Sequence, residues 1–95
     1  MGGDYSMRDN YSSYGFVCIS TKPAEEHRVY SKLLRIDGVI EIHPLFGEYD
    51  LIVKIGAQDD SKLKKIVDEQ IKEIDAVQRT LFLNISNSES MEKKL

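Results

Sequence analysis

A chain of 95 residues has the length of one small domain, and a core of this size buries only about 60 % of the surface that the unfolded chain exposes. Apolar residues make up 41 % of the chain and charged residues 31 %, which excludes disorder throughout. Acidic residues outnumber basic ones by 16 to 13, and the formal net charge is −3. The chain therefore has no excess positive charge for a phosphate backbone, and we expect no direct DNA binding.

The single cysteine, Cys18, excludes an intrachain disulfide and any site built from several cysteines. It lies in an apolar stretch, where a buried and reduced thiol is the usual state, and this indicates a cytoplasmic protein. No segment approaches the ~20 apolar residues of a membrane span, and residues 1–14 are too polar for a secretory signal. We therefore expect neither a membrane location nor secretion.

The N-terminal third predicts an arm, a strand and a helix. Residues 1–14 include Tyr5, Tyr11 and Tyr14 but show no helical or alternating period, so we expect a flexible arm. Residues 15–20 are apolar and predict a strand buried on both faces. Apolar side chains then recur at helical spacing in residues 25–36, which predicts a first helix, and the glycine after Asp37 ends it.

The middle of the chain predicts a β-hairpin. Residues 39–45 indicate a second strand with odd- and even-numbered side chains on opposite faces, and Pro44 near its end indicates an edge strand or a bulge. A short turn at residues 47–48 leads directly into a third strand, residues 49–57.

The last third predicts a helix, a strand and a tail. After a capping cluster at residues 58–61, one apolar stripe marks the second helix: Leu63, Ile66, Val67, Ile71 and Ile74. Residues 77–85 alternate as a fourth strand, and residues 86–95 predict a flexible C-terminal tail. The ordered domain is thus expected over residues 15–85.

A short internal repeat supports the fold class. The junction Ile36-Asp37-Gly38-Val39 returns 38 residues later as Ile74-Asp75-Ala76-Val77, each time between a helix and a strand. Together with the element order, this predicts an α+β domain of the ferredoxin-like β-α-β-β-α-β type, with two helices on one face of a four-stranded antiparallel sheet. Both faces of the strands carry large apolar residues, so we expect a dimer joined sheet to sheet.

Residues with catalytic or metal-binding chemistry are scattered. His27 and His43 are far from Cys18 in the sequence, and no spacing typical of a metal site or a phosphate-binding loop is present. The acidic pairs at residues 25–26 and 59–60 stand where carboxylates cap helices. We therefore expect no enzyme activity, no cofactor and no metal.

The segment Leu45-Phe46-Gly47-Glu48-Tyr49-Asp50 is the strongest candidate site. Asp50 directly precedes an apolar run, where a carboxylate needs a partner such as backbone N–H groups or a cation. Exposed amides around Gly47 would hold the carboxylate of a ligand and Asp50 its ammonium group, a combination that suits an amino acid. The alternative is that Gly47 only makes the turn and Tyr49 only packs at the end of the sheet.

The same turn carries a resemblance to a known family. Residues 46–54, Phe-Gly-Glu-Tyr-Asp-Leu-Ile-Val-Lys, are preceded by Asp37-Gly38-Val39 and followed by residues 75–80, Asp-Ala-Val-Gln-Arg-Thr. In this order of elements the segment resembles the effector domain of Lrp/AsnC transcriptional regulators, often called the RAM domain. The resemblance runs from about Gly15 to about Ile85.

The resemblance implies how the domain assembles and binds. Such domains dimerise through their sheets, their dimers often form octameric rings, and amino-acid effectors bind between dimers near this turn. Carried over by position, Thr80 would reach the pocket from a neighbouring dimer, with Phe82 beside it. The pocket itself would be lined by the turn residues Phe46, Gly47, Glu48, Tyr49 and Asp50. Phe82 stands where the family frequently has a second threonine, which favours an apolar or aromatic effector.

Full regulators carry a helix-turn-helix of about fifty residues before this domain, and 14 residues are too few for one. The chain therefore resembles a stand-alone form that senses an amino acid or small metabolite and regulates transcription through full-length Lrp/AsnC partners. Two alternatives remain: a small dimeric α/β-barrel enzyme of monooxygenase-like or haem-related type, and a purely structural oligomerisation subunit.

Overall fold

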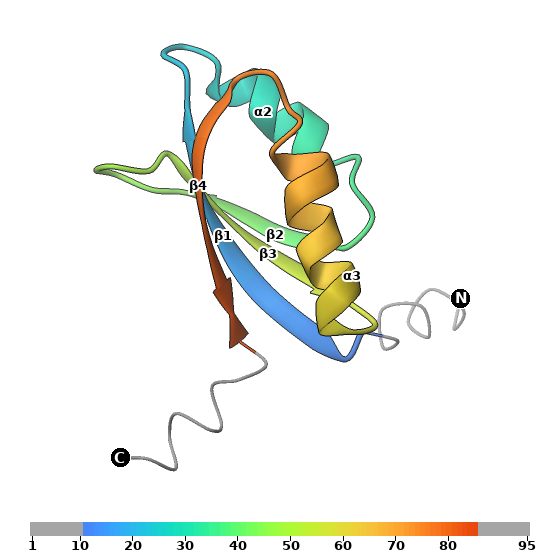
Figure 1. Cartoon of the computed structure of the whole chain (residues 1–95). Coiled ribbons are helices and arrows are strands. Elements are labelled where there is room, and N and C mark those ends of the chain that lie inside the picture. The colour runs from blue at the N-terminus through green and yellow to red at the C-terminus, as the bar shows by residue number, and fades with distance from the viewer. Residues whose placement is uncertain (1–10, 86–95) are drawn as a thin grey trace, which may run out of the picture.

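The computed structural model describes residues 11–85 and has the predicted ferredoxin-like architecture. The elements in chain order are β1 (Ser13–Thr21), α2 (Glu26–Leu33), β2 (Val39–Pro44), β3 (Leu51–Ala57), α3 (Asp60–Lys65), its π-helical continuation η1 (Ile66–Ile71) and β4 (Val77–Asn84). The antiparallel sheet has the order β2-β3-β1-β4, and both helices cover one of its faces (Figure 1). Within the described range no helix is both long and apolar enough to cross a membrane.

The core lies between the helices and this face of the sheet. Val17 and Ile19 of β1, together with Val53 and Ile55 of β3, are fully buried there. Most of the apolar positions predicted for the two helices are buried: Val29, Leu33, Leu63, Ile66, Val67, Ile71 and Ile74. Ile36, which follows the end of α2, is half-buried. Hydrophobic burial of these two stripes against the inward-facing strand residues therefore drives the fold.

The opposite face of the sheet is open in the single chain. Phe16 and Cys18 of β1 are only half-buried on this face, and Leu81 and Leu83 of β4 are 44 % and 49 % exposed. Our prediction that β1 is buried on both faces is therefore not met within one chain. The helices cover one side of the strand, and no other described element covers the second.

Strand β2 departs from the predicted alternation because of a bulge. The register with β3 shifts between Val39 and Glu41. The extra residue turns Val39 and Ile42 to the same side, and both pack against the core. Pro44 ends this strand, which is an edge strand as predicted, but the bulge lies at the other end.

The first strand begins at Ser13, two residues earlier than predicted. The N–H of Ser12 donates to the carbonyl of Ala57 at 2.9 Å, and Ser13 pairs with Ala57 in the register. The ring of Tyr11 lies against Gly56, so close that a Cβ on this glycine would come within 2.7 Å of the ring. The first ten residues of the predicted arm, including Tyr5, and the predicted tail of residues 86–95 lie outside the described residues.

The two helix-to-strand junctions that share the sequence repeat also share a turn. The N–H of Val39 donates to the carbonyl of Ile36 at 3.2 Å, and the N–H of Val77 donates to the carbonyl of Ile74 at 3.0 Å. In the first junction Gly38 has φ +101°, a conformation that a side chain opposes.

The structure confirms only some of the predictions made for the helix caps and for the second helix. Asp59 caps α3 by accepting from the N–H of Lys62 at 2.8 Å, as predicted, whereas Glu25 makes no capping hydrogen bond with its side chain. The π-helical segment, with Lys72 N–H donating to the carbonyl of Val67 at 2.9 Å, was not predicted. Asp68 lies between Lys64 and Lys72, whose hydrogen bonds lower its pKa.

The loop from β1 to α2 contains a strained residue. Glu25 N–H donates to the carbonyl of Lys22 at 3.0 Å, closing a turn in which Ala24 has φ +67°. A positive φ at this place in a turn is typical of glycine, and an L side chain there raises the energy of the folded state.

We expect Ala24→Gly to raise the free energy of unfolding by about 0.5 kcal/mol, since relief of the strain slightly outweighs the added freedom of the unfolded chain. Gly38→Ala should lower it by about 2 kcal/mol, because the new Cβ would also lie 2.8 Å from the carbonyl oxygen of Gly56. Urea unfolding measures both. Equal effects of the two changes would contradict this account of the backbone.

Candidate functional site

The turn between β2 and β3 stands out from the body of the domain (Figure 1). The N–H of Leu45 donates to the carbonyl of Asp50 at 2.9 Å and closes the hairpin. At its tip Phe46 is 99 % exposed, and Gly47 has φ +119°. Apart from the two chain neighbours of Gly47, no atom of residues 11–85 lies within 4 Å of the position that a Cβ on this glycine would take. The backbone of the tip is therefore accessible to another molecule.

Asp50 is anchored to the end of β1. Its backbone N–H donates to the carbonyl of Ile19 at 2.8 Å. Its carboxylate oxygen Oδ2 accepts from the backbone N–H of Thr21 at 2.7 Å and from the Thr21 hydroxyl at 3.3 Å. The sequence predicted that an acid in this position needs a hydrogen-bond partner. Thr21, the last residue of β1, is that partner.

The second oxygen of Asp50 is uncommitted. Among residues 11–85, Oδ1 has no hydrogen-bond partner, and no lysine or arginine side chain forms a salt bridge with this carboxylate. Within the described residues the Asp50 carboxylate therefore offers one free acceptor oxygen, as the binding of an ammonium group requires.

Tyr49 contacts a cation that the sequence did not single out. The guanidinium carbon of Arg79 lies 5.4 Å from the centre of the Tyr49 ring, a cation–π distance. Arg79 is on β4 opposite Ser20 of β1, so the contact between Arg79 and Tyr49 crosses over β1. Ser20 is buried, although its side chain points to the face of the sheet that the helices do not cover. In the sequence, a lone cation in the otherwise apolar and polar-neutral residues 77–85 was the available signal.

Thr80 and Phe82 lie on the other face of the sheet. Thr80 pairs with Ile19 and Phe82 with Val17, and both are half-buried on the side that the helices cover. The Phe82 ring packs against Gly15, where a Cβ would lie 2.6 Å from it. The structure thus gathers Phe46 and its neighbours in the turn but does not bring Phe82 to them within one chain.

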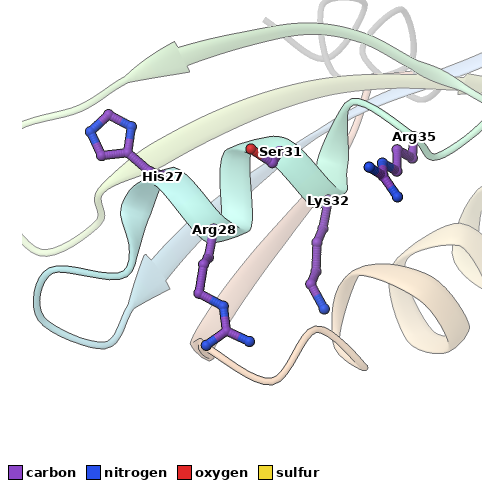
Figure 2. A pocket seen from close by; sticks show the side chains of 5 residues that line it. All are labelled: His27, Arg28, Ser31, Lys32 and Arg35. Atoms are coloured by element: carbon purple, nitrogen blue, oxygen red, sulfur yellow. The ribbon is translucent and has the colours of Figure 1, made fainter.

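Both histidines lie in solvent. The His43 side chain is 65 % exposed and is 3.4 Å from Glu41. His27 borders a shallow depression of about 330 Å³ on the outer side of α2, lined with Arg28, Ser31, Lys32 and Arg35 (Figure 2). In Figure 2 these side chains fan out from α2 and the turn that follows it instead of converging on a common point. Neither imidazole is thus placed in an enclosed site where a catalytic base would act.

Acidic and metal-ligating side chains are also dispersed. Over residues 11–85 no group of three His, Cys, Asp or Glu side chains is arranged to hold a metal ion. Cys18 is half-buried on the open face of the sheet and is a free thiol. The turn with Asp50 and Arg79 is therefore the place where the described residues combine opposite charges with accessible backbone.

The comparisons with known proteins agree on one family. Residues 15–90 match the model of the Lrp/AsnC ligand binding domain. The crystal structure of FFRP-DM1 aligns with a TM-score of 0.74 at 30 % identity, covering 77 % of this chain and 97 % of that one. AsnC of E. coli aligns with a TM-score of 0.73 at 25 % identity, covering 82 % and 53 %. A Neisseria meningitidis transcriptional regulator in complex with L-Met shares the fold, with a TM-score of 0.71 at 18 % identity.

The curated relatives are mostly transcriptional regulators. An uncharacterised HTH-type transcriptional regulator of Pyrococcus furiosus is 32 % identical over 77 residues, which are 78 % of this chain and 51 % of the relative. A homocitrate synthase of Sulfolobus acidocaldarius is 36 % identical over 53 residues, which are 56 % of this chain and only 11 % of the enzyme. The chain spans about half the length of the regulators it matches. With the family model, the fold and these relatives in agreement, the chain belongs to the Lrp/AsnC family and forms its ligand-binding domain.

Proposed function

We propose that this domain senses an amino acid or a similar small metabolite at the turn of residues 46–50. The observation that carries the proposal is the Asp50 carboxylate, which Thr21 fixes through one oxygen and which no other described residue binds at the second oxygen. A rigidly held acid with an open acceptor binds an ammonium group without first having to be ordered. Its half-buried position weakens the screening that water would give.

The exposed backbone at Gly47 supports a site that another subunit completes. Among residues 11–85, Phe46 and Gly47 have no neighbours that would enclose a ligand. A bound molecule would therefore lie between this turn and a second copy, which supplies the remaining wall. Thr80 belongs to the proposed site from that second copy, whereas the Phe82 ring is already packed against Gly15.

The relatives support a sensing role coupled to different outputs. The Neisseria regulator with the same fold was crystallised with L-Met, and a segment similar to this chain lies within a homocitrate synthase. A domain found with both regulators and an enzyme is more consistent with ligand sensing than with one particular chemistry. We propose that here the signal passes to DNA-binding regulators of the same family, in the cytoplasm.

We further propose that the domain works as a sheet-to-sheet homodimer, and that dimers assemble into a higher oligomer such as an octameric ring. The open face of the sheet carries Phe16, Leu81 and Leu83, which one chain leaves in contact with water. A second copy has the same apolar face, so a two-fold axis brings two complementary surfaces together.

The sensing proposal predicts a thermal or calorimetric response of the oligomer to at least one of the twenty amino acids. Asp50→Asn should weaken that response by about tenfold or more, because a neutral amide replaces the carboxylate that binds the ammonium group of the ligand. Glu69→Gln, which changes an exposed acid on η1 in the same way, should leave the response unchanged. A complete absence of ligand response would instead favour a purely structural subunit.

Asp50 also has a structural role that can be measured separately. Asp50→Ala removes both hydrogen bonds to Thr21 and should lower the free energy of unfolding by about 2 kcal/mol. Thr21→Val removes only the longer bond from the hydroxyl and should lower it by about 1 kcal/mol or less. Urea unfolding compares the two, and a larger loss for the threonine variant would show that the backbone N–H contributes little.

The dimer proposal predicts that a charge on the open face separates the subunits. Leu81→Lys should convert the dimer to a monomer at micromolar concentration, because a dry interface would have to bury an unpaired ammonium. Sedimentation velocity measures the change, and Lys64→Glu on the outer side of α3 is the control that should stay dimeric. A wild-type chain that sediments only as a monomer would rule out the dimer itself.

A further inference from the structure

Arg79 is a cation near the candidate site that no described residue neutralises. It is exposed on β4, and it forms no salt bridge with any acid of residues 11–85. Its guanidinium carbon lies over the face of the Tyr49 ring, 5.4 Å from the ring centre. This contact orients the guanidinium electrostatically and requires none of its five N–H donors, which remain available to an acceptor.

The position of Arg79 follows from the sheet. Arg79 pairs with Ser20 on β1, and the next residue of β1, Thr21, holds Asp50. Tyr49, which contacts Arg79, is the neighbour of Asp50 in the chain. The Arg79 guanidinium and the Asp50 carboxylate are thus both fixed at the same end of the sheet. Arg79 is paired with Ser20, and Asp50 is bound by the next residue, Thr21.

Opposite charges arranged in this way favour a particular class of ligand. An α-amino acid carries an ammonium group and a carboxylate on the same carbon atom, so a site for it benefits from both a fixed anion and a fixed cation. Arg79 is suited to the second task, because a planar guanidinium binds a carboxylate through two parallel hydrogen bonds. A simple amine or an amino-acid amide would use only Asp50.

We propose that Arg79, held by Tyr49, recognises the carboxylate of the effector and makes the site selective for free α-amino acids over their amides. This rests on the proposed sensing function. It assigns the carboxylate mainly to Arg79, where the sequence alone pointed to the backbone amides around Gly47. The pair also explains why an aromatic residue precedes the acid in this turn: the ring positions the cation.

The test measures binding of the twenty amino acids and of their α-carboxamides to the full chain by calorimetry. For the amino acid that binds most tightly, the wild type should prefer the free acid to its amide by about tenfold or more. Arg79→Gln should lose that preference by weakening only the acid, and Arg79→Lys should retain part of it. Arg35→Gln removes an exposed arginine from the α2 region and should keep the full preference.

The outcomes separate this inference from the sensing proposal. If an amino acid binds, Asp50→Asn weakens it, and Arg79→Gln still distinguishes acid from amide, the role of Arg79 is refuted and sensing stands. If no amino acid binds the wild type, both fail together. Unfolding midpoints of the variants identify any loss that comes from a damaged fold, and Arg79→Lys then decides the question with the charge preserved.

Discussion

A four-stranded sheet with two helices can bury only one of its faces, and this constraint shapes the whole molecule. The helices pack on the side of Val17 and Ile19 and complete a core there. The other side, with Phe16, Leu81 and Leu83, has no cover within the described chain. A strand sequence that is apolar on both faces is therefore what the proposed sheet-to-sheet dimer requires.

The candidate site depends on how the hairpin is fastened to that sheet. Asp50 is bound through its backbone to Ile19 and through its carboxylate to Thr21, so the turn is tied to the central strand at two points. At the tip beyond this tie, Phe46 is almost fully exposed, and no described residue other than its chain neighbours approaches the Cβ position of Gly47. A rigid anchor beside an exposed tip is the arrangement a binding loop needs, because the anchor limits the entropy lost on binding while the tip remains accessible.

Much of the architecture could be predicted because it depends on local periodicity. The stripe Leu63 to Ile74 and the repeated junction at Ile36 and Ile74 specified the helices and their exits, and both are present as predicted. The errors in the sheet lie where non-local pairing decides. The bulge after Val39 depends on the register with β3, and the early start of β1 depends on the carbonyl of Ala57. Neither partner is visible from the strand's own sequence.

The sequence by itself determined the order of elements, the family resemblance and the importance of the turn at Gly47 to Asp50, since these are properties of neighbouring residues. Only the tertiary structure decided that Thr21 satisfies Asp50 and that Arg79 meets Tyr49, across separations of 29 and 30 residues. It also decided that the Phe82 ring packs over Gly15 within the chain. Which face a strand residue takes, and which distant group it meets, follows from the pairing of the whole sheet, and one strand's pattern does not contain that information.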